Sequence, residues 1–162
     1  MKTAILATAA VMVAMTAHGQ QIGVQQILDD PGVIQAMKTA WGLSTAGLWQ
    51  AEASFRLDAC ASGYEIVAEG FSNQAMHKTV KIIPGKTFAL FHVHPSRGEG
   101  PPTEPDRKIA DTYRVKMFTM HMSGLWEYDP DTGKTTRLRI GATWGKPPSQ
   151  HKRGPEIARK ER

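Results

Sequence analysis

The strongest constraint on the fold is a largely apolar run, Phe88–Val93, that carries His92 and is followed by His94 and Pro95. The run does not alternate between apolar and polar residues, so we expect a central strand over 87–94 that is buried on both faces. Side chains two residues apart on a strand point to the same face. His92 and His94 therefore present two imidazoles side by side where the strand ends.

Asp106 follows this strand after a loop rich in Gly and Pro. The segment Thr103-Glu104-Pro105-Asp106 predicts the start of a helix that runs to about Tyr113, because it offers a Thr cap and acids in the first turn. A helix start can deliver the Asp106 carboxylate to the end of the strand. Two imidazole nitrogens and one carboxylate oxygen form a ligand set for Zn²⁺ that leaves one position for water. His92, His94 and Asp106 are therefore the candidate metal ligands.

The rest of the chain predicts helices and strands in an order typical of an α+β domain. Asp30 as a cap and Pro31 in the first turn predict a helix over 31–41. From residue 48 apolar and polar residues alternate, which predicts a first strand with Glu52 on its polar face. A hairpin turn is expected at 129–133. Further strands are predicted over 64–68, 79–83, 115–121, 125–128 and 135–144. This order indicates a single α+β domain with a mixed sheet.

The two ends of the chain differ from this domain. Lys2 precedes an apolar run over 4–17 that is too short to span a bilayer, and Gly19 offers a cleavage position. Residues 1–19 therefore predict a signal peptide, and the protein is expected to be periplasmic or secreted without stable membrane insertion. Residues 145–162 carry a net charge of +4 and predict a disordered basic tail. Between them we distinguish a helical segment, 20–47, and a metal-binding domain, 48–144.

Charge and cysteine content narrow the function classes. Residues 20–144 carry no net charge, so the basic character of the chain lies in its tail. The predicted folded part has no basic stripe with interleaved aromatic residues, and we expect no nucleic-acid binding by it. Cys60 is the single cysteine, which excludes an intramolecular disulfide. Stability must then come from packing.

The candidate ligands carry a resemblance to a known family. The pattern His92-Val93-His94-Pro95-Ser96, a spacer, Thr103-x-x-Asp106 and an upstream acid is similar to the motif of the JAB/MPN (JAMM) metalloprotease family. That motif is a Glu on an early strand, then His-x-His, seven residues, Ser, two residues and Asp. The run from His92 to Ser96 is especially similar to the bacterial RadC-like branch. The resemblance covers about Leu48 to Trp144, with a spacer one residue longer and Thr103 in place of Ser.

The resemblance implies a fold, an activity and residue roles. The fold would be a curved mixed sheet flanked by helices, with a layering like that of cytidine deaminases. The activity would be zinc-dependent hydrolysis of a peptide or isopeptide bond, with His92, His94 and Asp106 binding Zn²⁺. Thr103 would help to stabilise the tetrahedral intermediate. The general base would be an upstream Glu, for which Glu52 is the candidate and Glu65 and Glu69 are alternatives. Export favours a peptide or protein substrate of the cell envelope.

Two other interpretations of the same residues stay open. His92, His94 and Glu99 nearly fit the first cupin motif, which would make Glu99 rather than Asp106 the third ligand and imply a metal protein of another class. A JAB-like domain without catalysis would instead serve as a binding domain. Measuring zinc in variants of Asp106 and Glu99 separates the cupin interpretation from the hydrolase. Measuring peptide cleavage by the zinc-loaded protein separates the binding domain from it.

Overall fold

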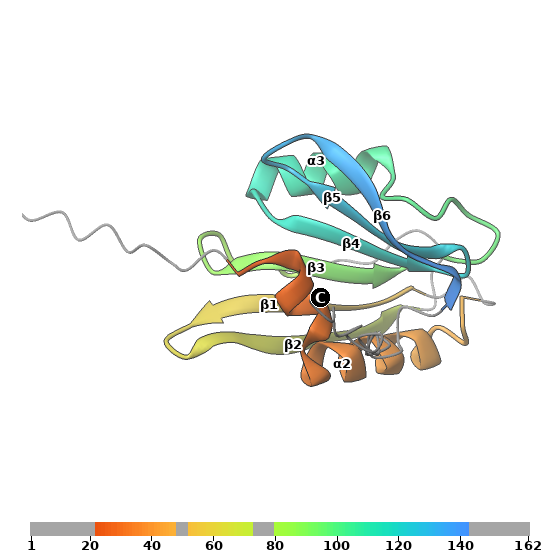
Figure 1. Ribbon diagram of the computed structural model, residues 1–162, viewed down its shortest axis with the longest axis horizontal. Coiled ribbons are helices and arrows are strands. Elements are labelled where there is room, and N and C mark those ends of the chain that lie inside the picture. The colour runs from red at the N-terminus through yellow and green to blue at the C-terminus, as the bar shows by residue number, and fades with distance from the viewer. Residues whose placement is uncertain (1–21, 48–51, 73–79, 143–162) are drawn as a thin grey trace, which may run out of the picture.

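The computed structural model describes residues 22–47, 52–72 and 80–142. Three helices of these residues flank one sheet: α1 (Val24–Asp29), α2 (Pro31–Leu43) and α3 (Glu104–Tyr113). The strands are β1 (Glu52–Cys60), β2 (Gly63–Ser72), β3 (Thr87–Val93), β4 (Lys116–His121), β5 (Gly124–Asp129) and β6 (Lys134–Ile140). Figure 1 shows the curved sheet with α2 at its lower part and α3 at its upper part. The predicted α+β class with a mixed sheet is confirmed.

The strand order places β3 inside the sheet. The order is β2-β1-β3-β4-β5-β6. Neighbouring strands run antiparallel except β3 and β4, which run parallel. A parallel pair requires a crossover connection, and α3 lies in it. The carboxyl ends of β3 and β4 therefore lie at the same end of the sheet, where the loop that leads to α3 begins.

Both faces of β3 are buried, which explains why its sequence does not alternate. On the face covered by α1 and α2, the ring of Phe91 stacks on Phe55 and on Phe118, with centroids 4.5 and 4.3 Å apart. On the opposite face, Leu90 packs with Ala110 of α3. The prediction of a central strand at 87–94 is therefore confirmed.

The start of α2 follows the predicted capping chemistry. The side chain of Asp30 accepts hydrogen bonds from the backbone N–H of Gly32 at 2.6 Å and of Val33 at 3.3 Å, and Pro31 opens the helix. The hydroxyl of Tyr64 also donates to Asp30, at 2.5 Å. One carboxylate thus caps α2 and ties it to β2.

The prediction of a strand over 79–83 is wrong for its described part. Residues 80–83 are irregular. The carbonyl of Ile83 accepts from the N–H of Lys86 at 3.0 Å and of Thr87 at 2.9 Å, so turn hydrogen bonds occupy the end of this segment. Val80 packs against the cluster around Leu90. The apolar pattern here reflects packing against the sheet and not pairing within it.

The polar face of β1 is buried rather than solvated. Ser54, Arg56 and Asp58 lie on this face, and all three are buried. The guanidinium Nε of Arg56 donates to both carboxylate oxygens of Asp58 at 3.0 Å. Asp58 also accepts from the hydroxyl of Thr87 at 2.6 Å. This network satisfies the two charged residues inside the protein.

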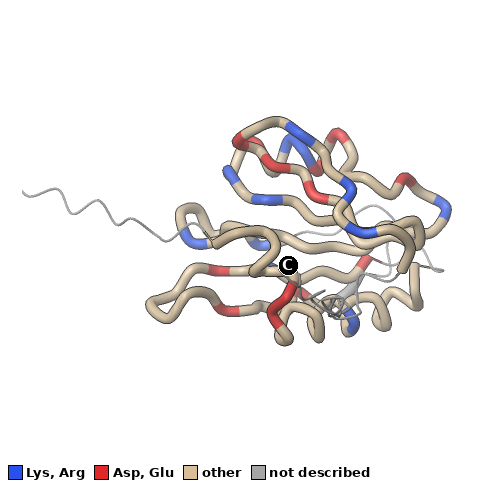
Figure 2. The backbone as a smooth tube through the Cα atoms, in the orientation of Figure 1, with Lys and Arg blue, Asp and Glu red and all other residues tan. Residues whose placement is uncertain are grey.

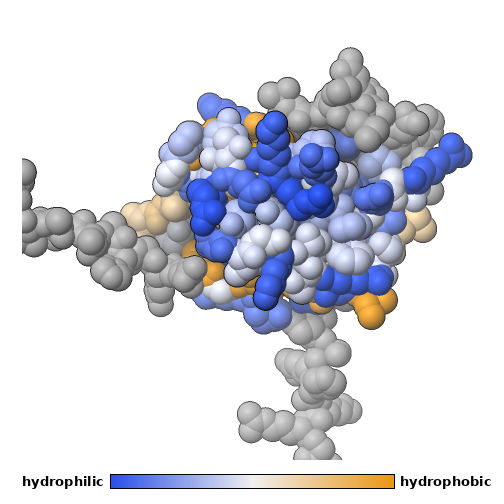
Figure 3. Space-filling model, turned by 90° about the horizontal axis from the view of Figure 1, so that it is seen from above, coloured by the Kyte–Doolittle hydropathy of each residue, from blue (hydrophilic) through white to orange (hydrophobic). Residues whose placement is uncertain are grey.

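The predicted signal peptide (1–19), the first residues of the first strand (48–51) and the basic tail (145–162) lie outside the described residues. Among those described, no helix has the length and apolar character needed to cross a membrane. Acidic and basic residues are interspersed over the described elements (Figure 2). The face seen from above is mostly hydrophilic (Figure 3). Large apolar side chains of the described chain lie mainly between the sheet and its helices.

Candidate metal centre

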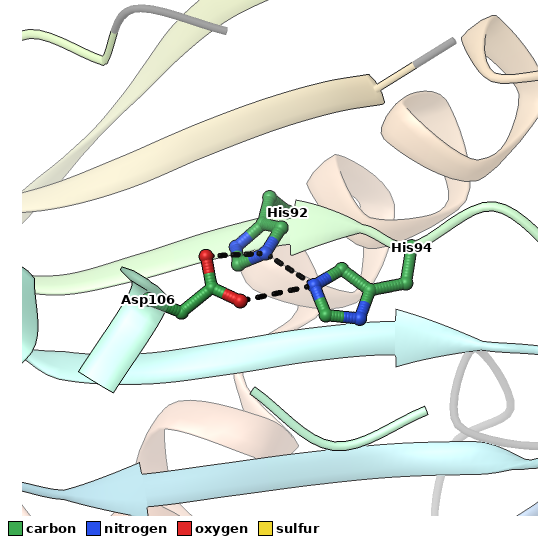
Figure 4. A group of neighbouring side chains, drawn as sticks. All are labelled: His92, His94 and Asp106. Carbon is green, nitrogen blue, oxygen red and sulfur yellow. Dashed lines mark hydrogen bonds and ion pairs between the residues drawn. The ribbon is translucent and has the colours of Figure 1, made fainter. Parts of the chain in front are cut away.

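His92, His94 and Asp106 converge where β3 ends and α3 begins (Figure 4). The Nε2 atoms of the two histidines lie 2.8 Å apart. Asp106 Oδ1 lies 3.4 Å from His92 Nε2, and Asp106 Oδ2 lies 3.3 Å from His94 Nε2. Among the described residues, this is the group of His, Cys, Asp or Glu side chains that could hold a metal ion. The structure thus brings together the three side chains that the sequence singles out.

The strand and the helix position these groups through regular backbone bonding. His92 is part of β3, and the N–H of His94 donates to the carbonyl of Met120 at 2.9 Å, which extends the pairing with β4 by one residue. Asp106 is the third residue of α3. Both predicted local structures, a strand end with His-x-His and a helix start with Asp, are therefore present.

Hydrogen bonds outside the group fix the orientation of two of its members. Asp106 Oδ2 accepts from the backbone N–H of Thr103 at 2.7 Å and from its hydroxyl at 2.6 Å. His94 Nδ1 lies 2.7 Å from the carbonyl oxygen of Glu99, so Nδ1 carries the proton and donates it there. The remaining nitrogen of His94, Nε2, then presents its lone pair toward Asp106. This is how proteins orient metal-binding histidines and carboxylates.

The electrostatics of the group favour a cation at its centre. Burial alone would raise the pKa of Asp106, but the neighbouring imidazoles of His92 and His94 and the hydroxyl of Thr103 lower that pKa far below its usual range. Burial also acts to lower the pKa of His94, yet the nearby Asp106 and the Glu99 carbonyl raise it overall. Because the Nε2 lone pair faces a carboxylate, a positive charge is needed between them. A proton or a metal ion can supply it.

The spacing and chemistry of the donors fit a divalent metal. Zinc bonds of about 2.0–2.1 Å at tetrahedral angles place neighbouring ligand atoms about 3.3 Å apart. The two nitrogen–oxygen distances, 3.4 and 3.3 Å, match this spacing, and the nitrogen–nitrogen distance of 2.8 Å is shorter. Two imidazoles and one carboxylate suit zinc and also ferrous iron. The residues present can therefore hold a metal ion with three protein ligands.

Glu52 lies in the same groove as the metal group. Glu52, His92 and Asp106 line a groove of about 440 Å³. Ser54 pairs with His92 across β1 and β3, and Glu52 lies two residues before Ser54 at the start of β1. The negative charge of Glu52 also contributes to the raised pKa of His94.

The two alternative glutamates are engaged elsewhere. Glu65 accepts from Lys86 at 2.6 Å, and Glu69 pairs with Arg56. Neither residue lines the groove that contains the metal group. Of the three glutamates considered from the sequence, Glu52 is therefore the one that lines the groove with His92 and Asp106.

Thr103 and Glu99 have contacts that differ from some of the roles considered for them. The hydroxyl of Thr103 donates a hydrogen bond to Asp106, so its proton is engaged by that carboxylate. The side chain of Glu99 is exposed, and the metal-capable group contains Asp106 and not Glu99. Glu99 contributes its backbone carbonyl to His94. The geometry thus favours Asp106 over Glu99 as the third ligand.

Sequence reasoning did not single out two residues that anchor the loop between His94 and α3. The hydroxyl of Thr119 donates to the carbonyl of Gly100 at 2.6 Å. His121 is buried, with Nδ1 2.7 Å from the hydroxyl of Ser123 and Nε2 3.4 Å from the carbonyl of Ser96. His92 and Thr119 are paired across β3 and β4. Only the parallel register of β3 and β4 could have revealed these residues, because the motif from His92 to Asp106 contains no residue of β4.

At Gly100 the loop backbone approaches two neighbouring side chains so closely that little room is left for a Cβ. A Cβ at this position would lie 2.6 Å from the hydroxyl oxygen of Ser123 and 2.7 Å from the indole nitrogen of Trp126. The loop backbone at Gly100 therefore lies against the side chains of Trp126 in β5 and of Ser123 in the turn that precedes it. This contact helps to fix the path from His94 to Asp106.

Comparisons of the chain with protein-family models, with curated proteins and with solved structures found no match.

Proposed function

We propose that the protein is a zinc-dependent hydrolase of the JAB/MPN type that cleaves a peptide or isopeptide bond. The observation that carries this proposal is the convergence of His92, His94 and Asp106 within a groove that Glu52 also lines. Three protein ligands and a nearby carboxylate are the arrangement that metal-assisted hydrolysis requires. The family motif at the same residues agrees with this chemistry.

The roles of the residues follow from their contacts. A bound zinc ion would lower the pKa of a water molecule toward neutrality and polarise the substrate carbonyl. Glu52 would take the proton from that water and pass it to the leaving amine. Thr103 holds the Asp106 carboxylate, and the Glu99 carbonyl holds the ring of His94. These two contacts keep the ligand atoms aimed at one point.

The walls of the groove indicate the kind of substrate. Apart from Glu52, His92, Asp106 and Lys81, the groove is lined by apolar or aromatic side chains: Val80, Ile82, Leu90, Ile109, Tyr113 and Met117. Ile109 and Tyr113 lie one turn apart on α3 and are 40% and 44% exposed. A peptide with a large apolar side chain next to the scissile bond would bury it here. Together with the predicted export, this favours peptides or secreted proteins of the cell envelope.

Glu52→Gln tests the proposed chemistry without removing a metal ligand. The variant should retain its zinc and lose cleavage by about 10²- to 10⁴-fold, since an amide cannot accept the proton. The measurements are zinc content by mass spectrometry and cleavage of a peptide library by the zinc-loaded protein. Glu65→Gln is the matched control, because Glu65 is bound to Lys86 outside the groove, and it should cleave as the wild type does.

Two results would contradict this proposal, one its mechanism and the other its activity. Cleavage by Glu52→Gln at the wild-type rate would remove Glu52 from the mechanism. Normal zinc content with no cleavage of any peptide or isopeptide by the wild type would instead support a metal-bearing binding domain.

A further inference from the structure

Ser54 has a buried hydroxyl that the fold leaves unpaired. The residue is 4% exposed, and its Oγ has no hydrogen-bond partner among the residues that the structure describes. Its neighbours on the same face of β1 are satisfied, since Arg56 and Asp58 bind one another and Asp58 binds Thr87. Buried hydroxyls without a partner are rare and costly in folded proteins. An unpaired one beside a polar site suggests a partner that belongs to that site.

The position of Ser54 identifies this site. Ser54 pairs with His92 across β1 and β3, so the two side chains project from the same face. Directly opposed residues have Cβ atoms about 4.5–5.5 Å apart. His92 Nε2 faces His94 and Asp106. Among the described residues, none hydrogen-bonds to the other ring nitrogen of His92, Nδ1.

We infer that Ser54 is a positioning residue of the metal centre, whose hydroxyl accepts the N–H of His92 Nδ1 directly or through one buried water. This inference rests on the proposed metal site and extends it to β1. A histidine that binds a metal through Nε2 carries its proton on Nδ1 and donates it to a fixed acceptor. His94 has such an acceptor in the Glu99 carbonyl, at 2.7 Å. Ser54 gives His92 the matching one.

The pairing of Ser54 with His92 across β1 and β3 permits this contact. Without a metal ion the two atoms are not hydrogen-bonded, and a turn of the side chains of these directly opposed residues would bring them together. One water molecule can bridge them if the ring does not rotate. Because the Ser54 hydroxyl is buried, such a water would not exchange freely with the groove.

A purely structural role for Ser54 makes a different prediction. If the position only requires a small side chain, the hydroxyl is dispensable for metal binding. If the hydroxyl orients His92, its removal weakens metal binding while relieving an unpaired group in the metal-free protein. The positioning role therefore predicts that stability and metal affinity respond separately to the same substitution.

The test compares Ser54→Ala, Ser54→Thr and Thr87→Ala in the full chain. Zinc affinity is measured by competition with a chromophoric chelator, and the melting temperature is measured without metal. Ser54→Ala should bind zinc about 10- to 100-fold more weakly, with an unchanged or higher melting temperature. Ser54→Thr keeps a hydroxyl and should keep the affinity. Thr87→Ala removes the hydroxyl that donates to Asp58 at the other end of β3, and it should lower the melting temperature without changing the affinity.

The outcomes separate this inference from the proposed function. Wild-type zinc affinity in Ser54→Ala would overturn the role of Ser54 and leave the metal site standing. A wild-type protein that binds no zinc would overturn the proposed function itself. If Ser54→Ala does not fold, nitrogen NMR of the zinc-loaded wild type decides. A proton on His92 Nδ1 that is protected from exchange supports the inference, and one that exchanges at once with solvent overturns it.

Discussion

At the scale of single residues, Thr103 links helix capping to the candidate metal site. Its backbone N–H and its hydroxyl both donate to the carboxylate of Asp106. Thr103→Ala should weaken zinc binding about tenfold, because one hydrogen bond that orients the carboxylate is lost. The same change should lower the free energy of unfolding by about 1 kcal/mol through the weakened cap.

A chelator competition titration and a denaturant melt check both effects. Thr103→Ser retains the hydroxyl and serves as the matched control. It should restore the affinity and most of the stability. If the Ala and Ser variants bound zinc equally well, the hydroxyl would have no part in holding Asp106.

The sequence indicated the candidate ligands but not the residues that surround and orient them, and the reason is physical. His92 and His94 follow from strand periodicity, and Asp106 follows from helix-capping chemistry, which are both local rules. The Glu99 carbonyl is a backbone acceptor, and any residue type could supply it. Ser54 and Thr119 flank His92 because of the register on either side of β3. Register depends on the whole sheet, so a motif cannot reveal these neighbours.

At the scale of elements, α2 depends on Asp30. The hydroxyl of Tyr64 is the main cause of the lowered pKa of Asp30, and the N–H groups of Gly32 and Val33 act in the same direction. A carboxyl whose pKa is lower in the folded state stabilises the protein above its unfolded pKa, and this stabilisation is lost as the pH falls. The wild type should therefore lose stability below about pH 4.

Asp30→Ala should reduce the free energy of unfolding near neutral pH by about 0.5–2 kcal/mol, because the cap is lost. It should also show a smaller decline on acidification than the wild type. Tyr64→Phe keeps the cap but removes the main cause of the lowered pKa, so it should flatten the acid decline with a smaller loss at neutral pH. Denaturant unfolding over an acid-to-neutral series measures both. An acid decline in Asp30→Ala equal to that of the wild type would contradict this assignment.

Helices and strands with strong local signals were predicted closely. The strand expected over 79–83 was not found in its described part, because it has no neighbouring strand. α2, β3, α3 and the hairpin turn at 129–133 follow from caps, apolar runs and turn residues. The segment 80–83 has residues typical of a strand. In this sheet β1 and β3 each already have two neighbours, so the segment that precedes β3 has no free edge beside it. Tertiary pairing overrode the local preference.

At the scale of the whole molecule, metal binding should stabilise the fold, since the three ligands meet only when β3 and α3 are assembled. Zinc at a hundred times its dissociation constant should add about 2.7 kcal/mol to the free energy of unfolding. Asp106→Asn should show almost none of this gain, because an amide is a poor ligand for zinc. Calorimetry of the metal-free proteins with and without added zinc measures the difference. An equal increase in both proteins would place the ion elsewhere.

The arrangement of the sheet accounts for how distant segments form one site. The parallel pairing of β3 and β4 sends the chain through a loop into α3, and this crossover returns Asp106 to the end of β3. The antiparallel pairing of β1 on the other side brings Glu52 into the same groove. Ligands and candidate base thus come from three elements that the fold places around one edge of the sheet.

The metal content of the purified protein tests the central claim most directly. Wild type, His94→Ala and Asp106→Ala should be purified identically and measured by mass spectrometry for zinc and iron. We expect about one equivalent of a divalent metal in the wild type and a large loss in both variants, since each lacks one of three ligands. Equal metal content in all three proteins would contradict the account.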